Sequence, residues 1–317
     1  MNRIPDLREI PDLPDEIIQA GLNGELVLFV GAGISMLVGY PSWNQLADKA
    51  FKKLCPNGLN YSELNQLEKL EAKKRLSIAL NIADEKGINL DLPSLFKESD
   101  NAGTIYDAIN GIGCVCVTTN YDGSLAPKFC DVSDNPLVPG LAKAQSTKPQ
   151  VRRIWDKNEF FAKCLDEPGT VVHLHGFFSE PGTMILTTKH YLEHYDHPTV
   201  QHFLGELFLR KTVLFIGYRL EEAEILEHIL RRGGVKSTGD RRRFVLQGFY
   251  KTHDALYKNL NQYYEKSFGV HLIGFVRDYK EYEQQEDILR AWSLKLRVNK
   301  PPLRNDLDYM DEVLNSG

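Results

Sequence analysis

A glycine turn, Gly31-Ala32-Gly33, follows five consecutive apolar residues, Leu26 to Val30. Glycine has no Cβ, so the chain can turn sharply here and a ligand can approach the backbone closely. If a helix begins after Ser35, its free N–H groups and the positive end of its dipole would face an anion, typically a diphosphate. The alternative is a tight strand-to-helix turn without a ligand, because short glycine motifs are common.

Polar residues that suit proton transfer and ligand orientation follow two further apolar stretches. Thr119-Asn120-Tyr121-Asp122 ends one of them, and His175 ends the other. Histidine titrates near neutral pH and suits a general base, while asparagine forms hydrogen bonds without adding charge. The structural alternatives are Asx turns at Asn120 and Asp122, and a satisfied buried histidine at His175. His173 and His175 could also bind a metal, but no acidic or cysteine partner has a persuasive ligand spacing, so we expect no metal site.

These turns need a scaffold that brings them together, and the apolar pattern predicts one. The expected strands are residues 26–30, 114–118, 171–174, 184–187, 212–216, 244–246 and 270–275. The expected helices are residues 15–23, 42–55, 62–86, 188–195, 200–210, 221–232, 254–266 and 282–296, with a short one at 159–165. Strands that alternate with helices predict an α/β fold with a Rossmann-like, doubly wound parallel sheet. The carboxyl ends of its strands share one edge, so the turns after them, including Gly217 to Leu220, are expected to converge.

The chain is expected to form one domain, residues 1–317, with a helical insertion at about 43–110 and a C-terminal tail at about 299–317. The insertion includes the longest expected helix, 62–86, whose leucines recur at spacings of three and four and whose interior lacks glycine and proline.

Composition limits the class of protein. Hydrophobic residues make up 42% and charged residues 26% of the 317, as in ordinary soluble domains, and the net charge of −5 gives no global reason to bind nucleic acid. No apolar run reaches the roughly 18 residues of a membrane span, and the first residues lack the apolar core of a signal peptide, so we expect a cytoplasmic protein without membrane contact. The five cysteines include no Cys-x-x-Cys pair, which argues against structural zinc and favours free thiols in a reducing compartment.

The ordered set of motifs resembles the sirtuin-like NAD-binding family, and most of all the bacterial sirtuin-like NAD hydrolases of antiphage defence. The matching segments follow the order of the family and are residues 31–35, 39–43, 119–122, 174–176, 184–187 with Tyr191, and 217–220. The resemblance implies that NAD is the substrate, that Asn120 and Asp122 lie by the nicotinamide ribose and the glycosidic bond, and that His175 is the general base. The residues implied to bind the cofactor are Gly31, Ala32, Gly33 and Ser35 at the diphosphate, Gly217 and Tyr218 beside the adenosine ribose, and Trp43 and Thr119.

The activity implied by the resemblance is that of an NAD+ glycohydrolase, which releases nicotinamide and ADP-ribose through an oxocarbenium-like state. Such an enzyme would act as the NAD-depleting effector of an antiphage (abortive infection) system. Protein-deacetylating sirtuins usually carry two zinc-binding cysteine pairs and an Asp-Phe-Arg run, whereas this chain has no such pairs and has Ser42-Trp43-Asn44 in place of that run. Arg219 and Glu221 also differ from the more usual serine and aspartate. The alternatives are a protein deacylase or ADP-ribosyltransferase and a non-catalytic module that senses NAD or ADP-ribose.

The partner predictions rest on the family pattern and on one basic segment. We expect a homo-oligomer, a separate defence partner such as a HerA-type DNA-translocating ATPase, or truncation from a longer parent. Residues 231–243 are strongly basic and would contact cofactor phosphates, a neighbouring subunit or DNA, or would form a solvated loop. The sequence leaves direct nucleic-acid contact, the activating signal and cleavage of NADP open.

Overall fold

The fold is centred on a parallel β-sheet of seven strands. The computed structural model describes residues 6–55, 58, 60–96, 104–129, 151–218, 220, 223–232 and 241–299. The strands are β1 (Leu26–Val30), β2 (Val115–Thr118), β3 (Arg152–Ile154), β4 (Thr170–His173), β5 (Thr212–Ile216), β6 (Arg243–Phe249) and β7 (His271–Val276). They run in the order β3-β4-β2-β1-β5-β6-β7, and every neighbouring pair is parallel. The predicted Rossmann-like α/β fold is therefore confirmed.

The strand order creates a switch point at β1. After β1 the chain builds one half of the sheet through β2, and it later returns to place β5 on the other side of β1. The register aligns Val30 with both Thr118 and Ile216, and Thr118 with His173. The carboxyl ends of the four central strands therefore lie level with one another, and the turns that follow them begin side by side.

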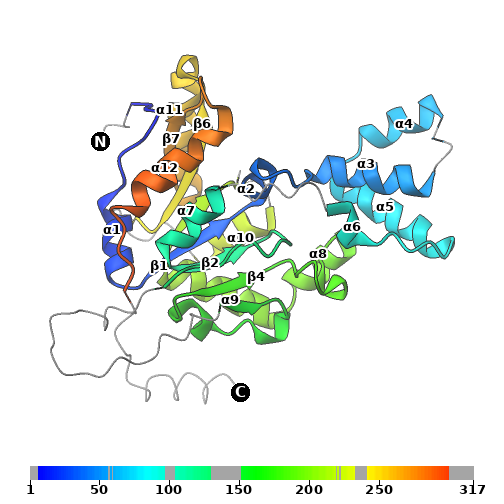
Figure 1. The fold of residues 1–317 in the computed structure, drawn as a ribbon, viewed down its shortest axis with the longest axis horizontal. Coiled ribbons are helices and arrows are strands. Elements are labelled where there is room, and N and C mark those ends of the chain that lie inside the picture. The colour runs from blue at the N-terminus through cyan, green and yellow to red at the C-terminus, as the bar shows by residue number, and fades with distance from the viewer. Residues whose placement is uncertain are drawn as a thin grey trace.

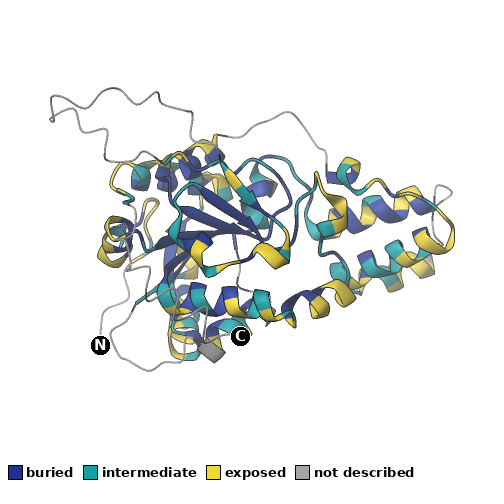
Figure 2. Cartoon of the chain, turned by 90° about the horizontal axis from the view of Figure 1, so that it is seen from below, coloured by how far each residue is buried: buried dark blue, intermediate teal, exposed yellow. Residues whose placement is uncertain are grey.

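Helices cover both faces of the sheet (Figure 1). They are α1 (Asp15–Leu22), α2 (Ala32–Leu37), α3 (Trp43–Leu54), α4 (Tyr61–Glu68), α5 (Ala72–Glu85), α6 (Leu92–Phe96), α7 (Ile105–Ile112), α8 (Thr188–Tyr195), α9 (Pro198–Arg210), α10 (Ala223–Arg232), α11 (Asp254–Phe268) and α12 (Gln284–Ser293). Side chains on alternating positions of β1 enter opposite cores: Val27 and Phe29 pack with helices α8 to α11, whereas Leu28 packs with α1, α7 and α12. The central strands β1 and β5 are buried along their length between these layers (Figure 2).

Helices α3 to α6 extend beyond one end of the sheet, on the right of Figure 1. A third apolar core joins α3, α5 and α6, and it also contains Tyr121, Met184 and Leu186 from the segments that follow β2 and β4. Helix α7 instead packs against the sheet with α12. The boundaries of the helical insertion stay a prediction.

Three local predictions are wrong. Residues 62–86 form two helices, because Glu71 is extended (φ −58°, ψ 146°) and the apolar spacing skips from Leu70 to Leu76. Residues 184–187 form no strand: the Ile185 N–H donates to the carbonyl of His175, past the end of β4, and the chain then enters α8. Strand β3 was missed because it has only three residues, two of them arginines.

Both edges of the sheet are short or partly covered. Among the described strands, β3 lies at one edge and pairs with β4 alone. At the other edge, Arg8 forms an isolated parallel bridge with Phe275, and the Val276 N–H donates to the Arg8 carbonyl at 2.8 Å.

The remaining segments named above lie partly or wholly outside the described residues: Arg219, Glu221, most of the basic segment 231–243 and the C-terminal tail beyond residue 299. Within the described ranges, none of the helices combines the length and apolar character that crossing a bilayer requires.

Candidate functional site

The glycine turn after β1 packs directly against the turn after β5. The N–H groups of Gly31 and Gly33 donate to the carbonyls of Ile216 and Gly217, both at 2.9 Å. A Cβ on Gly31 or Gly33 would come within 2.6 or 2.7 Å of the Gly217 carbonyl oxygen, and Gly217 itself has a φ of +60°. Close contact between two backbones therefore requires all three glycines, and two of the amides expected at a diphosphate are already engaged.

Asn120 ties the turn after β2 to the glycine turn. Its Nδ2 donates to the Gly31 carbonyl at 3.0 Å, and its backbone N–H donates to Thr118 Oγ1 at 3.0 Å. Thr118 Oγ1 in turn donates to the Val30 carbonyl at 2.8 Å, and His173 Nδ1 lies 3.1 Å from the Asn120 carbonyl oxygen. Since a carbonyl only accepts, the His173 proton resides on Nδ1. Asn120 is 5% exposed and is fixed at side chain, amide and carbonyl.

Asp122 is a buried acceptor for three donors. Ser35 Oγ and Tyr106 Oη donate to Oδ2 at 2.7 and 3.0 Å, and the Ser124 N–H donates to Oδ1 at 3.0 Å. Burial, reinforced by the charge of Asp122, raises the pKa of Tyr106 well above its ordinary value. Tyr106 therefore remains a donor, and Asp122 presents its carboxylate beside Asn120 in a fixed orientation. Ser35 lies inside α2, which begins at Ala32, earlier than the sequence suggested.

Side chains from neighbouring elements also hold the rest of this turn. Arg153 of β3 donates to the carbonyls of Gly123 and Leu125, both at 3.1 Å. Asn110 of α7 donates to the Ser124 carbonyl at 3.1 Å and accepts from the Ala126 N–H at 2.7 Å. Residues 119–126, hereafter the clamped turn, are thus fixed by groups that no local sequence signal identifies.

His175 is fully buried and contacts two tyrosines of α8. Its Nε2 lies 2.8 Å from Tyr195 Oη, and its Nδ1 lies 3.3 Å from Tyr191 Oη. Burial, with smaller contributions from His194 and Lys73, lowers the pKa of His175 well below its ordinary value. The ring is therefore neutral at physiological pH, which is the form that a general base needs.

The structure places the predicted site residues in two groups. Gly31, Ser35, Asn120, Asp122 and Gly217 are joined by direct contacts. His175 comes from the same edge, because the Leu174 N–H donates to the Thr118 carbonyl at 2.7 Å. No hydrogen bond among the described contacts links it directly to Asn120.

The other predicted cofactor residues surround these groups. The Trp43 ring lies between the two groups, 6.0 Å from Tyr121 and 6.5 Å from Tyr191. Thr119 is buried in the clamped turn. The Tyr218 ring packs against Phe29 and Phe215 at 5.2 and 5.5 Å. Ala32 opens α2.

Sequence reasoning missed Tyr106 and Tyr195 as site neighbours, and it considered His173 only as a metal ligand. Tyr195 had a signal, because it lies four residues after Tyr191 on the same helix and so shares its face. Tyr106 had none, because its contact with Asp122 joins α7 to the segment after β2, and nothing in the local sequence pairs these two elements.

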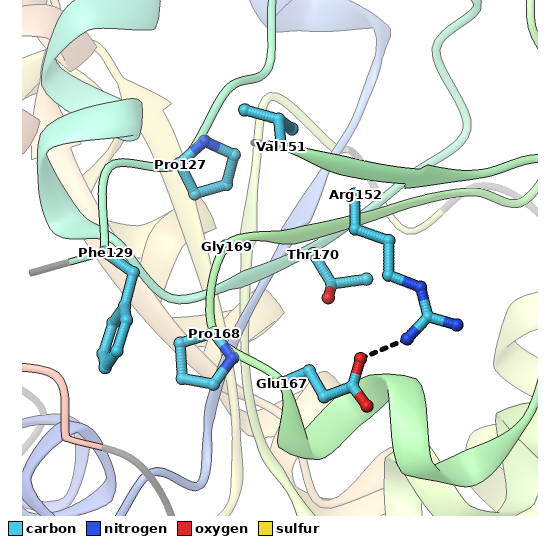
Figure 3. Close-up of a pocket in the computed structure, with 8 residues that line it drawn as sticks. All are labelled: Pro127, Phe129, Val151, Arg152, Glu167, Pro168, Gly169 and Thr170. Carbon is cyan, nitrogen blue, oxygen red and sulfur yellow. Dashed lines mark hydrogen bonds and ion pairs between the residues drawn. The ribbon is translucent and has the colours of Figure 1, made fainter. Parts of the chain in front are cut away.

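A separate hollow of about 180 Å³ lies at the opposite end of the strands, beside the beginnings of β3 and β4 (Figure 3). It is lined by Pro127, Phe129, Val151, Arg152, Glu167, Pro168, Gly169 and Thr170. An ion pair between Arg152 and Glu167 crosses its mouth. None of the residues predicted to do chemistry lines this hollow, so the candidate site is defined by the strand ends instead.

The fold and this arrangement define a Rossmann-like α/β protein whose site is assembled at the switch point of a parallel sheet. The chain belongs to the SIR2-like domain family, whose model matches residues 115–273. It is also 25% identical over 316 aligned residues to defense-associated sirtuin 2 of Bacillus subtilis, an alignment that covers 93% of this chain and 28% of that relative. The resemblance to the sirtuin-like family of antiphage defence is therefore confirmed, and the chain spans little more than a quarter of this relative's length.

Proposed function

We propose that the protein is an NAD+ glycohydrolase that cleaves the nicotinamide–ribose bond and acts as the NAD-depleting effector of an antiphage system. The observation that carries the proposal is the buried network at the switch point, where Asn120 is bonded to Gly31 and Asp122 to Ser35. His175 follows β4 at the same edge, and SIR2-like domains bind NAD. A neutral amide, a fixed carboxylate and a neutral imidazole are suitable groups for orienting a ribose and removing one proton.

In the proposed reaction, water adds to C1′ of the nicotinamide ribose as the glycosidic bond breaks. The bonding electron pair leaves with nicotinamide, which becomes neutral, and the proton of the water passes to His175 directly or through a ribose hydroxyl. Because Asn120 Nδ2 donates to Gly31, its Oδ1 is the group that would orient that hydroxyl or water. Asp122 would stabilise the positive charge that develops on the ribose.

The cofactor contacts are proposals of the same kind. The amides of Gly31 and Gly33 already donate hydrogen bonds to the end of β5 and the turn after it. The diphosphate is therefore expected first at the Ala32 amide and Ser35. Trp43 and Thr119 would border the nicotinamide side, and Gly217 and Tyr218 the adenosine side. A homo-oligomer and a separate partner such as a HerA-type ATPase stay predictions.

A second candidate is a non-catalytic module that senses NAD or ADP-ribose. The observation that favours it is the complete burial of His175, with both ring nitrogens bonded to tyrosines.

Mass spectrometry of NAD, nicotinamide and ADP-ribose tests the proposal. Purified protein is assayed over a concentration series, with Asn120→Ala and His175→Ala as test variants. The matched controls are Asn158→Ala and His190→Ala, whose side chains are exposed. We expect nicotinamide and ADP-ribose in equal amounts, a loss of about 100-fold or more in both test variants, and no loss in the controls.

Undiminished turnover in the two test variants would place the site elsewhere. Tight NAD binding without turnover at any concentration would establish the sensing module instead.

A further inference from the structure

Helix α8 presents two tyrosines to the two ring nitrogens of His175. Tyr191 and Tyr195 lie one helical turn apart and are 2% and 7% exposed. Their hydroxyls lie 3.3 Å from Nδ1 and 2.8 Å from Nε2. A neutral imidazole has one donor and one acceptor nitrogen, so one tyrosine accepts a hydrogen bond from the ring and the other donates one to it.

The surroundings of the two tyrosines differ. Tyr191 faces α3 and α5, the helices that extend beyond the sheet. Lys73 Nζ of α5 lies 3.6 Å from its ring centroid, and Trp43 of α3 packs edge-on at 6.5 Å. Trp43 also contacts Tyr121, the neighbour of Asn120. Tyr195 instead packs beside His194 and His228, with ring centroids 5.2 and 6.2 Å away. Nδ1 is therefore linked through Tyr191 and Trp43 to Tyr121 of the clamped turn, whereas Nε2 meets Tyr195, which packs with two further histidines.

The ammonium group of Lys73 favours one direction of the hydrogen bonds. A cation over the ring face draws electron density from the phenol and makes its O–H a better donor. Tyr191 O–H then donates to Nδ1, which must carry the lone pair, and Nε2–H donates to Tyr195 Oη.

We propose that Tyr195 is a positioning residue that holds the His175 proton on Nε2, so that Nδ1 is the basic nitrogen. In the structure, the Tyr191 hydroxyl occupies the place at Nδ1 that the O–H group of the substrate or water would take. The catalytic part of this inference rests on the proposed function. In the reaction, the proton moves from the ribose hydroxyl or water to Nδ1 once Tyr191 yields its place. Nε2–H remains bonded to Tyr195, whose oxygen stabilises the imidazolium without taking its proton. A base that is oriented by a third group is a recurring arrangement in enzymes.

Nitrogen-15 NMR of histidine-labelled protein tests the positioning without any need for turnover. His175→Gln assigns the His175 signals by their disappearance. We expect the wild type and Tyr191→Phe to carry the proton on Nε2, and Tyr195→Phe to carry it wholly or partly on Nδ1. A wild-type proton on Nδ1, or an unchanged Nε2 proton in Tyr195→Phe, would overturn the inference.

Kinetics separates this inference from the proposed function. We expect Tyr195→Phe to lower kcat about 10-fold to 100-fold with KM nearly unchanged, while Tyr263→Phe, at a half-exposed tyrosine of α11, keeps wild-type values. If the wild type turns over NAD and Tyr195→Phe keeps full kcat, the positioning role fails and the proposed function stands. If the wild type never releases nicotinamide, the proposed function fails, and the NMR result alone decides the role of Tyr195. Thermal unfolding of each variant shows whether it remains folded.

Discussion

The two halves of the candidate site are held by different parts of the molecule. The clamped turn is bonded to the glycine turn after β1 and to α2, β3, β4 and α7, mostly through single donors to carbonyl or carboxylate oxygens. His175 is hydrogen-bonded to two tyrosines of α8. Helix α8 in turn contacts Lys73 of α5 and Trp43 of α3. The comparison teaches that Asn120 and Asp122 are held by the strand ends and by α2 and α7, two helices packed on the sheet, whereas the environment of His175 depends on α8 and on helices beyond the sheet. Changes in one half should therefore affect the other half less, and mainly through Trp43, which contacts both Tyr121 and Tyr191.

The largest effect is expected from Asp122→Ala, which removes a central hydrogen-bond acceptor from the clamped turn. The variant leaves Ser35, Tyr106 and the Ser124 amide without this acceptor. We expect the free energy of unfolding to fall by about 3 kcal/mol. The loss is not larger because the Ser35 and Tyr106 hydroxyls lie 3.1 Å apart and can bond each other. Urea unfolding measures the change, with the exposed Asp107→Ala as the control. A loss below about 1 kcal/mol would show that the turn is held without Asp122.

A smaller effect is expected on the pH dependence of stability, to which one histidine from each half contributes. Burial lowers the pKa of His173, beside the clamped turn, and of His194, beside His175, from 6.5 to about 4. The unfolded chain therefore takes up these protons first as pH falls, so the stabilisation present above pH 6.5 is lost toward pH 4. Between pH 7 and pH 5 we expect each histidine to lower the free energy of unfolding by about 2 kcal/mol.

Urea unfolding at the two pH values checks this expectation. His173→Phe and His194→Phe should each reduce the pH-dependent loss of stability by about 2 kcal/mol. Their effects should nearly add in the double variant, because no hydrogen bond or ring contact among the described residues joins the two histidines. His202→Gln, at an exposed position of α9, is the control. A wild-type pH dependence in both phenylalanine variants would contradict the assignment.

The smallest effect is expected from Lys73→Met, which keeps the aliphatic stem and removes the charge above Tyr191. We expect a loss of about 0.5–1 kcal/mol in stability. Hydrogen exchange should quicken more in peptides of α8 than in peptides of residues 115–126, because Lys73 lies over Tyr191, in the half around His175. Lys74→Met, at an exposed position of the same helix, is the control. Equal quickening of both peptides would mean that the two halves are coupled.

The sequence predicted those parts of the fold that are set by local pattern. The apolar run 26–30 and its counterpart 212–216 were identified because strands covered on both faces leave an uninterrupted apolar signal. β3 left none, since an edge strand of three residues can be rich in arginine. The break between α4 and α5 was missed because neither glycine nor proline marks it.

For the site, strand ends predicted that Gly31, Asn120 and Asp122 converge, and the structure brings them together. Tyr195 could have been found from its spacing of four residues after Tyr191. Tyr106 and Arg153 could not be predicted, because each contact depends on how two separate elements pack against each other. Sequence spacing fixes which face of an element a residue occupies, but not which neighbour it meets.

The edges of the sheet have a consequence for self-association. An open edge strand is a template for pairing with another chain, and proteins that stay dispersed shorten, charge or cover their edges. Here one edge is the three-residue, arginine-bearing β3, and the other is capped by the bridge from Arg8 to Phe275. Within the described part of the chain, any assembly of copies is therefore expected to form through helical surfaces, which leaves the order of the sheet, and with it the switch point, undisturbed.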